Sequence, residues 1–197
     1  MQRVNPIIYI IFLVLSCSNK QTVENSLSER DAAIEIKVQQ LLSKMTLQEK
    51  ASQMVNIGLP SILTGDYWSE RDSAVFAPKK FRKFITKYAV GSIHNTPGYL
   101  IGSKEWYRIV KEIQDSAIYK TRLGIPLLYG IDNIHGANYV KESVLFPHQI
   151  ALAATWNRDL SKINGEITAY ESRAASLPWN FNPNIDIAIN PLWGRIA

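Results

Sequence analysis

The stretch IPLLYGIDNIHG, residues 125–136, decides the fold, because it predicts a buried strand that ends abruptly in polar side chains. Apart from one proline and one glycine, its first seven residues are apolar or aromatic, which is typical of a strand buried on both faces in a parallel sheet. Asp132, Asn133 and His135 follow directly, and Gly136 closes the run. Polar groups at the carboxyl end of such a strand often hold ligands. Asp-Asn is also ordinary turn chemistry, so position alone leaves both interpretations open.

Strand-like and helix-like segments alternate on both sides of this stretch. Strands are expected at 54–58, 90–94, 125–132 and 179–187, and a long loop at 59–77 is expected at the carboxyl end of the first strand. Apolar residues at helical spacing, such as Leu160, Ile163 and Tyr170, predict helices between the strands. This alternation favours a parallel sheet with crossover helices, although an unrelated open α/β ligand-binding domain would fit the alternation equally well.

Four motifs in order make the sequence resemble glycoside hydrolase family 3, of the β-glucosidase type. They are MTLQEKASQM at 45–54, GIDNIHG at 130–136, VLFPHQIALAATW at 144–156 and WNFNPNIDIAINPLWGR at 179–195. The resemblance covers roughly residues 29–197 and implies a (β/α)8 barrel that removes β-linked sugars, usually glucose, from non-reducing ends with retention of configuration. The family's hexosaminidase branch has Asp-Gln-Glu-Gly-Gly where this chain has DNIHG at 132–136, which favours the glucosidase branch.

The expected fold class is α/β, the first half of a (β/α)8 TIM barrel truncated at the C-terminus. Four strands are predicted here, whereas a complete barrel has eight strands and typically needs about 250 residues. A retaining glycosidase uses two carboxylates about 5 to 5.5 Å apart. In the resembled family both lie later in the sequence than residue 197, so no catalytic residue is expected in this chain.

The resemblance does imply two residues that bind substrate. Asp132 matches the family aspartate that accepts hydrogen bonds from hydroxyls of the terminal sugar, a task that suits an acceptor-only group. Arg195 matches an arginine of the same subsite, whose rigid fork can donate to a hydroxyl while pairing with a carboxylate. Asn190 stands where the family often has aspartate, which puts a local salt bridge in doubt.

Other candidate residues have a structural interpretation that fits better. His135 is expected to shape the strand-end loop, and His148 is expected to be a hydrogen-bonded core histidine. Trp68, Trp179 and Trp193 could stack on sugar faces, although aromatic residues buried in barrel cores are commoner. The histidines lack a metal-ligand spacing and there is no Gly-rich phosphate loop, so neither a metal nor a cofactor is expected.

The formal charge of +5, from 22 basic and 17 acidic residues, raises the question of a nucleic-acid partner. The densest basic cluster is interleaved with apolar residues at helical spacing, which is typical of the wet face of an amphipathic helix. Its members are Lys79, Lys80, Arg82, Lys83 and Lys87. Because no nucleic-acid-binding module is recognised either, no nucleic-acid partner is expected.

The N-terminus has the pattern of a targeting segment. Arg3 precedes an apolar run at 7–15 that is too short to span a bilayer and of the right length for a secretory signal. The run ends in VLSC, and Cys17 is the only cysteine, so the pattern resembles a bacterial lipobox in which Cys17 becomes lipidated. The alternative is an ordinary signal peptide with an incidental cysteine. The expected domains are a lipoprotein signal peptide at 1–16, a polar tether at 17–28 and a partial barrel at 29–197.

Together these features predict a fragment of an exo-acting β-glucosidase that hydrolyses terminal β-linked glucosyl residues of oligo- or polysaccharides. Its expected partners are a β-linked oligosaccharide or glucoside and, through the lipid anchor, a membrane. It is expected to face the periplasm or cell exterior of a bacterium, and the 197-residue chain alone is expected to be inactive. The alternative is a non-catalytic sugar-binding protein or an inactive truncated lipoprotein.

Overall fold

The computed structural model describes residues 29–184, 189, 190 and 192. The chain divides into two compact units, Met1–Lys44 and Met45–Ala197. In the first unit the described part is a single helix, α2 (Glu29–Lys44). All the other described elements belong to the second unit, which contains the sheet.

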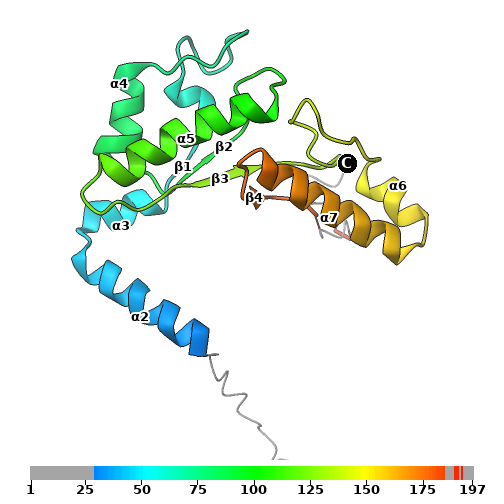
Figure 1. Ribbon diagram of the computed structural model, residues 1–197, viewed down its shortest axis with the longest axis horizontal. Helices are drawn as coiled ribbons and strands as arrows, with labels where there is room; N and C mark the ends of the chain where they lie inside the picture. Colours follow the sequence, from blue (N-terminus) through cyan, green and yellow to red (C-terminus); the bar gives the residue numbers. More distant parts are fainter. Residues whose placement is uncertain (1–28, 185–188, 191, 193–197) are drawn as a thin grey trace, which may run out of the picture. The chain divides into compact units, whose positions relative to one another are not determined.

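The second unit is built on four parallel strands in the order β1-β2-β3-β4 (Figure 1). They are β1 (Asn56–Gly58), β2 (Ser92–His94), β3 (Leu128–Ile131) and β4 (Trp179–Asn180). The register places Ile57 beside Ile93, Ile93 beside Tyr129, and Ile131 beside Asn180. Four parallel strands joined in order by helical crossovers form the first half of a (β/α)8 barrel, as predicted.

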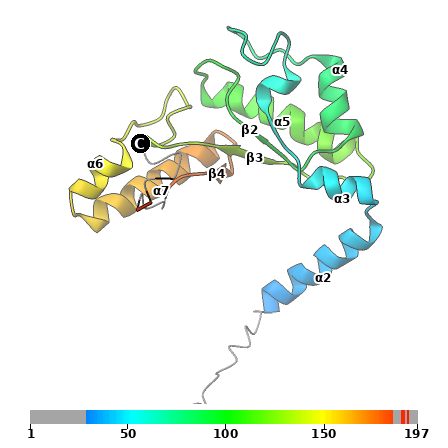
Figure 2. The same ribbon diagram turned by 180° about the vertical axis from the view of Figure 1, so that it is seen from behind.

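Helix α3 (Leu47–Gln53) precedes the first strand, and helical segments connect each strand to the next; the chain can be followed from α3 to α7 in Figure 2. In chain order the connecting segments are the 3-10 turn η2 (Leu59–Ile62), α4 (Pro78–Phe81), the π-helical η3 (Arg82–Lys87), α5 (Ser103–Tyr119), α6 (Gln149–Ala154) and α7 (Arg158–Ala174). A capping box opens α3, since Thr46 Oγ1 accepts from Glu49 N at 3.2 Å and the Glu49 carboxylate accepts from Thr46 N at 2.8 Å.

The strands are shorter than the sequence predicts. β3 begins at Leu128 rather than Ile125, because Pro126 has no N–H to donate and Gln114 bonds both main-chain polar groups of Leu127, at 3.0 and 2.6 Å. For the last strand, predicted at 179–187, the structure gives Trp179–Asn180, and residues 185–188 lie outside the described part.

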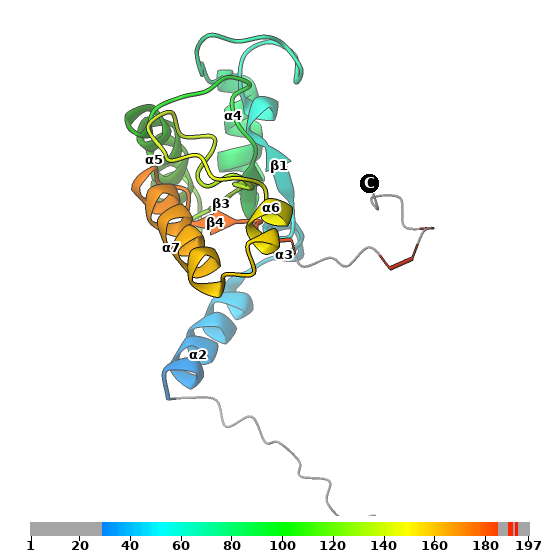
Figure 3. The same cartoon turned by 90° about the vertical axis from the view of Figure 1, so that its right-hand side faces the viewer.

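The hydrophobic core lies between the sheet and the helical segments η3 and α5, and α7 runs along the same face of the sheet as α5 (Figures 1 and 3). Trp106, Ile109 and Ile113 of α5 are buried, each at a position that helical spacing brings to one side. Trp106 packs edge-to-face on Tyr129 of β3, with 5.6 Å between ring centroids. Burying each of these side chains contributes about 1.5–3 kcal/mol, so α5 is firmly fixed to the sheet.

The basic cluster behaves as predicted. Its five side chains are exposed, while Ile85 between them is buried and Phe81 and Phe84 pack against the core. The segment is nevertheless split into a short α-helix and a π-helical turn, which periodicity alone did not predict.

The opposite face of the sheet carries side chains that alternate with the core residues. Leu128 of β3 is 55% exposed, and Trp179 of β4 is 38% exposed and packs edge-to-face on Phe181. Gly130 lies beside them, and a Cβ there would overlap the Phe181 ring. This is the face that lines the interior of a closed barrel.

Among the described residues, no helix combines the length and the apolar character that crossing a membrane requires.

Candidate functional site

Asp132 lies where the sequence predicts, directly after β3 at the carboxyl edge of the parallel sheet. It is exposed, and no described residue donates a hydrogen bond to its carboxylate. An exposed carboxylate with open acceptor positions at the carboxyl edge of a parallel sheet is suited to accept hydrogen bonds from a ligand.

Asn133, the residue after Asp132, fixes the backbone at this strand end. Its side chain is fully buried, and its Nδ2 donates to Ser172 Oγ of α7 at 2.8 Å. Its backbone N donates to Asn180 Oδ1 of β4 at 3.1 Å, so one residue joins the end of β3 to α7 and to β4. Sequence reasoning assigned no separate role to Asn133, because an Asp-Asn pair in a turn gives no sign of which side chain points inward.

The loop after Asp132 is folded back on itself by His135. Its Nδ1 lies 3.1 Å from Phe146 O, and Phe146 N donates to His135 O at 3.0 Å. Gly136 has φ +78°, a conformation that favours glycine. Glu171 of α7 accepts from Val144 N through both carboxylate oxygens, at 3.2 Å each. This arrangement confirms that His135 shapes the strand-end loop.

His148 does not lie in the core, contrary to the sequence prediction. It is exposed and forms the N-cap of α6, where its Nδ1 accepts from Ile150 N at 3.4 Å. The apolar run that follows His148 suggested burial, but Ile150 is itself 76% exposed.

The end of β2 and the loop after β1 contribute polar groups to the same edge. His94, the last residue of β2, has its Nδ1 3.0 Å from Oδ1 of Asn56, the first residue of β1. Asn95 O accepts from Tyr129 Oη at 2.7 Å, and Asn95 Nδ2 donates to Tyr67 Oη at 3.2 Å. Burial raises the pKa of Tyr129 well above its ordinary value, which keeps the phenol protonated as a donor. The loops after β1 and β2 are therefore tied to β3, the strand that carries Asp132.

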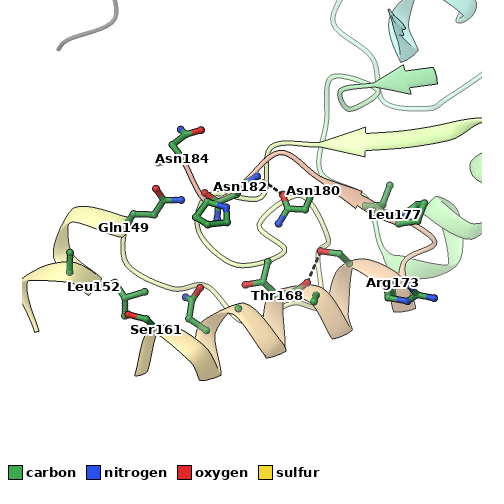
Figure 4. A pocket seen from close by; sticks show the side chains of 16 residues that line it. Gln149, Leu152, Ser161, Thr168, Arg173, Leu177, Asn180, Asn182 and Asn184 are labelled. Atoms are coloured by element: carbon green, nitrogen blue, oxygen red, sulfur yellow. Dashed lines mark hydrogen bonds between the residues drawn. The ribbon is translucent and has the colours of Figure 1, made fainter. Parts of the chain in front are cut away.

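A cavity of about 560 Å³ lies between α6, α7 and the segment around β4 (Figure 4). Its lining is rich in amides and hydroxyls, including Gln149, Thr168 and Asn182. Gln149 Nε2, Thr168 Oγ1 and Asn182 Oδ1 are buried and have no hydrogen-bond partner within the described part of the chain. Asp132 does not line this cavity, which lies against the helical layer.

Arg195 and Cys17, the other two predicted functional residues, lie outside the described residues, as does Trp193. Within the described ranges, no three histidine, cysteine or carboxylate side chains cluster as a metal site would require.

The fold defines a class of protein: parallel α/β barrel domains, in which ligands are typically bound at the carboxyl ends of the strands. Comparison with known proteins identifies the family within that class. Residues 46–197 match the model of the glycosyl hydrolase family 3 N-terminal domain. The chain therefore belongs to glycosyl hydrolase family 3, as its motifs indicate.

Two curated relatives and one solved structure show how far the likeness extends. The lysosomal β-glucosidase of Dictyostelium discoideum is 32% identical over 180 residues, which cover 87% of this chain and 21% of the relative. The periplasmic β-glucosidase of Salmonella typhimurium is 29% identical over 163 residues, 81% of this chain and 18% of the relative. The exo-1,3/1,4-β-glucanase ExoP of a Pseudoalteromonas species aligns with a TM-score of 0.62 at 30% identity, over 81% of this chain and 24% of that structure. The chain thus spans about a fifth of the length of these curated relatives.

Proposed function

We propose that this chain forms the sugar-binding half of the barrel in a retaining, exo-acting β-glucosidase that removes terminal β-linked glucosyl residues. The observation that carries the proposal is the placement of Asp132. Its carboxylate is exposed at the carboxyl edge of the sheet, while its neighbour Asn133 is buried and bonded to both α7 and β4. Such support holds a binding group in a fixed geometry, which a functional site requires.

The chemistry follows from the residue types. A carboxylate accepts hydrogen bonds from two neighbouring hydroxyls of one sugar, and each charge-assisted bond is worth about 1.5–3 kcal/mol. Arg195 supplies a guanidinium that donates to the same sugar. The nucleophile and the general acid/base, a pair of carboxylates in a retaining enzyme, come from outside these 197 residues.

The names of the relatives support the substrate class. Two are β-glucosidases, and the third is named for action on 1,3- and 1,4-linked β-glucans. We therefore propose β-1,3- and β-1,4-linked gluco-oligosaccharides as the substrates of the complete protein.

The test is to express the complete gene product and assay it on 4-nitrophenyl glycosides of glucose, xylose and N-acetylglucosamine. The proposal predicts preference for the β-glucoside, and proton NMR during turnover should show β-glucose as the first product. First release of α-glucose, or a preference for the N-acetylglucosaminide, would contradict it.

We also propose export and lipid anchoring at Cys17, with a signal peptide at 1–16 and a polar tether at 17–28. The supporting observations are the short apolar run before the only cysteine and the periplasmic location given in the name of the Salmonella relative. Labelling growing cells with a palmitate analogue should mark the wild-type protein but not a Cys17→Ala variant. Equal labelling of both, or of neither, would contradict anchoring at this residue.

A further inference from the structure

The loop that follows β1, residues 59–77, is held both at its base and at its tip. At the base, the buried Leu63 forms an antiparallel bridge with Phe76. At the tip, the Arg71 guanidinium donates to several main-chain carbonyls, that of Thr64 at 3.1 Å among them. One planar cation that gathers carbonyls in this way gives the tip a defined conformation before any ligand arrives.

Tyr67, in this tip, lies across the end of β1. A Cβ added to Gly58 would overlap the Tyr67 hydroxyl, so the glycine leaves the space that the phenol occupies. Asn95, which follows β2, donates from its Nδ2 to Tyr67 Oη at 3.2 Å. Trp68 packs edge-on against the Tyr67 ring, with 4.7 Å between ring centroids. The position of the Tyr67 hydroxyl is therefore fixed from the ends of two strands.

The Tyr67 hydroxyl still has its proton to donate. It accepts from Asn95, but within the described part of the chain it donates to no acceptor. The other phenols with bonded hydroxyls behave differently: Tyr129 Oη donates to Asn95 O at 2.7 Å, and Tyr99 Oη donates to Glu105 at 3.0 Å. A half-buried phenol usually has a partner for its O–H, so the Tyr67 proton is available to a ligand.

The Tyr67 hydroxyl and the Asp132 side chain lie on the same face of the sheet. The register aligns Gly58 of β1 with Gly130 of β3 through His94 of β2, and residues aligned in this way face the same side. Asp132 follows Gly130 by two residues, so the alternation along β3 brings it to that side as well. This is the face that lines the interior of a closed barrel.

The separation of the two groups fits one sugar ring. Two strand spacings of about 4.8 Å and a rise of about 3.3 Å per residue place positions 58 and 132 roughly 12 Å apart. Two hydrogen bonds of about 2.8 Å each take up about half of that separation. A donor above β1 and an acceptor after β3 can therefore bind opposite sides of a single sugar.

We propose that Tyr67 Oη donates a hydrogen bond to a hydroxyl of the terminal sugar, on the side of the ring away from Asp132. The inference rests on the function proposed above and deepens it, because it makes Tyr67 a specificity-determining residue for the terminal sugar. Asp132 accepts from hydroxyls on one side of the ring, and Tyr67 donates to a hydroxyl on the other.

The test measures kcat/KM of the complete gene product on 4-nitrophenyl β-D-glucoside and on the analogues that lack the 2-, 3-, 4- or 6-hydroxyl. Tyr67→Phe keeps the ring and removes only the hydroxyl. It should lower kcat/KM for the glucoside about five- to tenfold, the effect of losing one hydrogen bond. On one analogue, which lacks the partner hydroxyl, wild type and Tyr67→Phe should agree within about twofold. The loss caused by Asp132→Ala should shrink on a different analogue.

The matched control is Tyr129→Phe, which also removes one phenol hydroxyl, but a buried one that donates to Asn95 O. Any loss that it causes should be the same factor on the glucoside and on every analogue. A Tyr67→Phe loss that is equal on all substrates, or no loss at all, would overturn the inference while leaving the proposed function intact. Losses of Tyr67→Phe and Asp132→Ala that shrink on the same analogue would also overturn it. Failure of the wild-type protein to hydrolyse the glucoside would overturn the proposed function, and this inference with it.

Discussion

Gly136→Ala is the substitution that most directly probes the loop behind Asp132. Gly136 has φ +78°, where an L-residue costs about 1–2 kcal/mol. A Cβ there would also lie 2.5 Å from Val144 O, whereas an ordinary C···O contact is about 3.3 Å or longer. Val144 would therefore have to move by about 0.8 Å, and overpacking of this kind costs a further 1–3 kcal/mol or so.

The expected loss is thus about 2–5 kcal/mol, the sum of the strain and packing costs. Val144 cannot move freely, because Glu171 holds its N–H from α7 and Phe146, two residues on, is bonded to His135. The displacement should therefore reach the turn that carries Asp132 and weaken the glucose binding proposed there as well as stability.

The assay is urea unfolding of the complete gene product, with the folded fraction measured by pulse proteolysis. Gly165→Ala is the matched control, since Gly165 lies inside α7 with nothing within 4 Å of an added Cβ. It should stabilise the protein by about 0.5–1 kcal/mol, because alanine is the better helix former. A Gly136→Ala protein within about 0.5 kcal/mol of wild type, the spread of ordinary surface substitutions, would refute the reasoning.

Three further predictions concern the same unit. In urea unfolding, Asn133→Ala should destabilise the protein by about 1–2 kcal/mol, because it removes the hydrogen bond to Ser172. Thr168→Val should be neutral or stabilising, because Thr168 Oγ1 is buried without a partner in the described part of the chain. A Thr168→Val protein less stable than Asn133→Ala would contradict the assigned bonds. The hydrogen bond from Arg122 lowers the pKa of Glu49 from 4.5 to about 2, so the stability that Glu49 contributes is complete above pH 4.5 and is lost as the pH falls toward 2. The difference in unfolding midpoint between wild type and Glu49→Gln should therefore be larger at pH 6 than at about pH 3. The same difference at both pH values would exclude this linkage. The 197-residue chain alone should hydrolyse no aryl β-glucoside, and turnover that disappears on Asp132→Ala would disprove that expectation.

The order of strands and helices was predictable because it depends on local patterns. The run before Asp132 predicted the central strand, and the spacing of Trp106, Ile109 and Ile113 marks the helix that covers it. Strand ends were less predictable, because long-range partners such as Gln114 take over main-chain bonds that a ladder would otherwise use. No pattern in the sequence indicates where such a partner comes from.

Helix α7 shows the limit of reading periodicity. Its apolar positions Leu160, Ile163 and Tyr170 predicted a helix correctly, yet these side chains are 45%, 47% and 77% exposed. The buried positions are instead Thr168 and Ser172, whose small size lets α7 come close to β3 and β4. Periodicity identifies a helix, but it does not say which of two stripes meets the sheet.

The position of a candidate site residue was predictable where a motif indicates it, and not predictable where tertiary contacts determine its surroundings. Asp132 was identified from its motif, and the structure places it at the strand end. Asn133 and Asn95 were not, because their roles depend on partners 39 and 34 residues away in sequence, Ser172 and Tyr129. Arg71 likewise gives no signal in the sequence, since its partners are main-chain carbonyls.

The most direct test of the account is the kcat/KM of the complete gene product on 4-nitrophenyl β-D-glucoside, compared between wild type and Asp132→Ala. Loss of two charge-assisted hydrogen bonds, about 3–6 kcal/mol together, predicts a fall of about 10²- to 10⁴-fold with an unchanged unfolding midpoint, since Asp132 is exposed. Retention of kcat/KM within about threefold of wild type, less than 1 kcal/mol of transition-state binding, would show that Asp132 does not hold the terminal sugar.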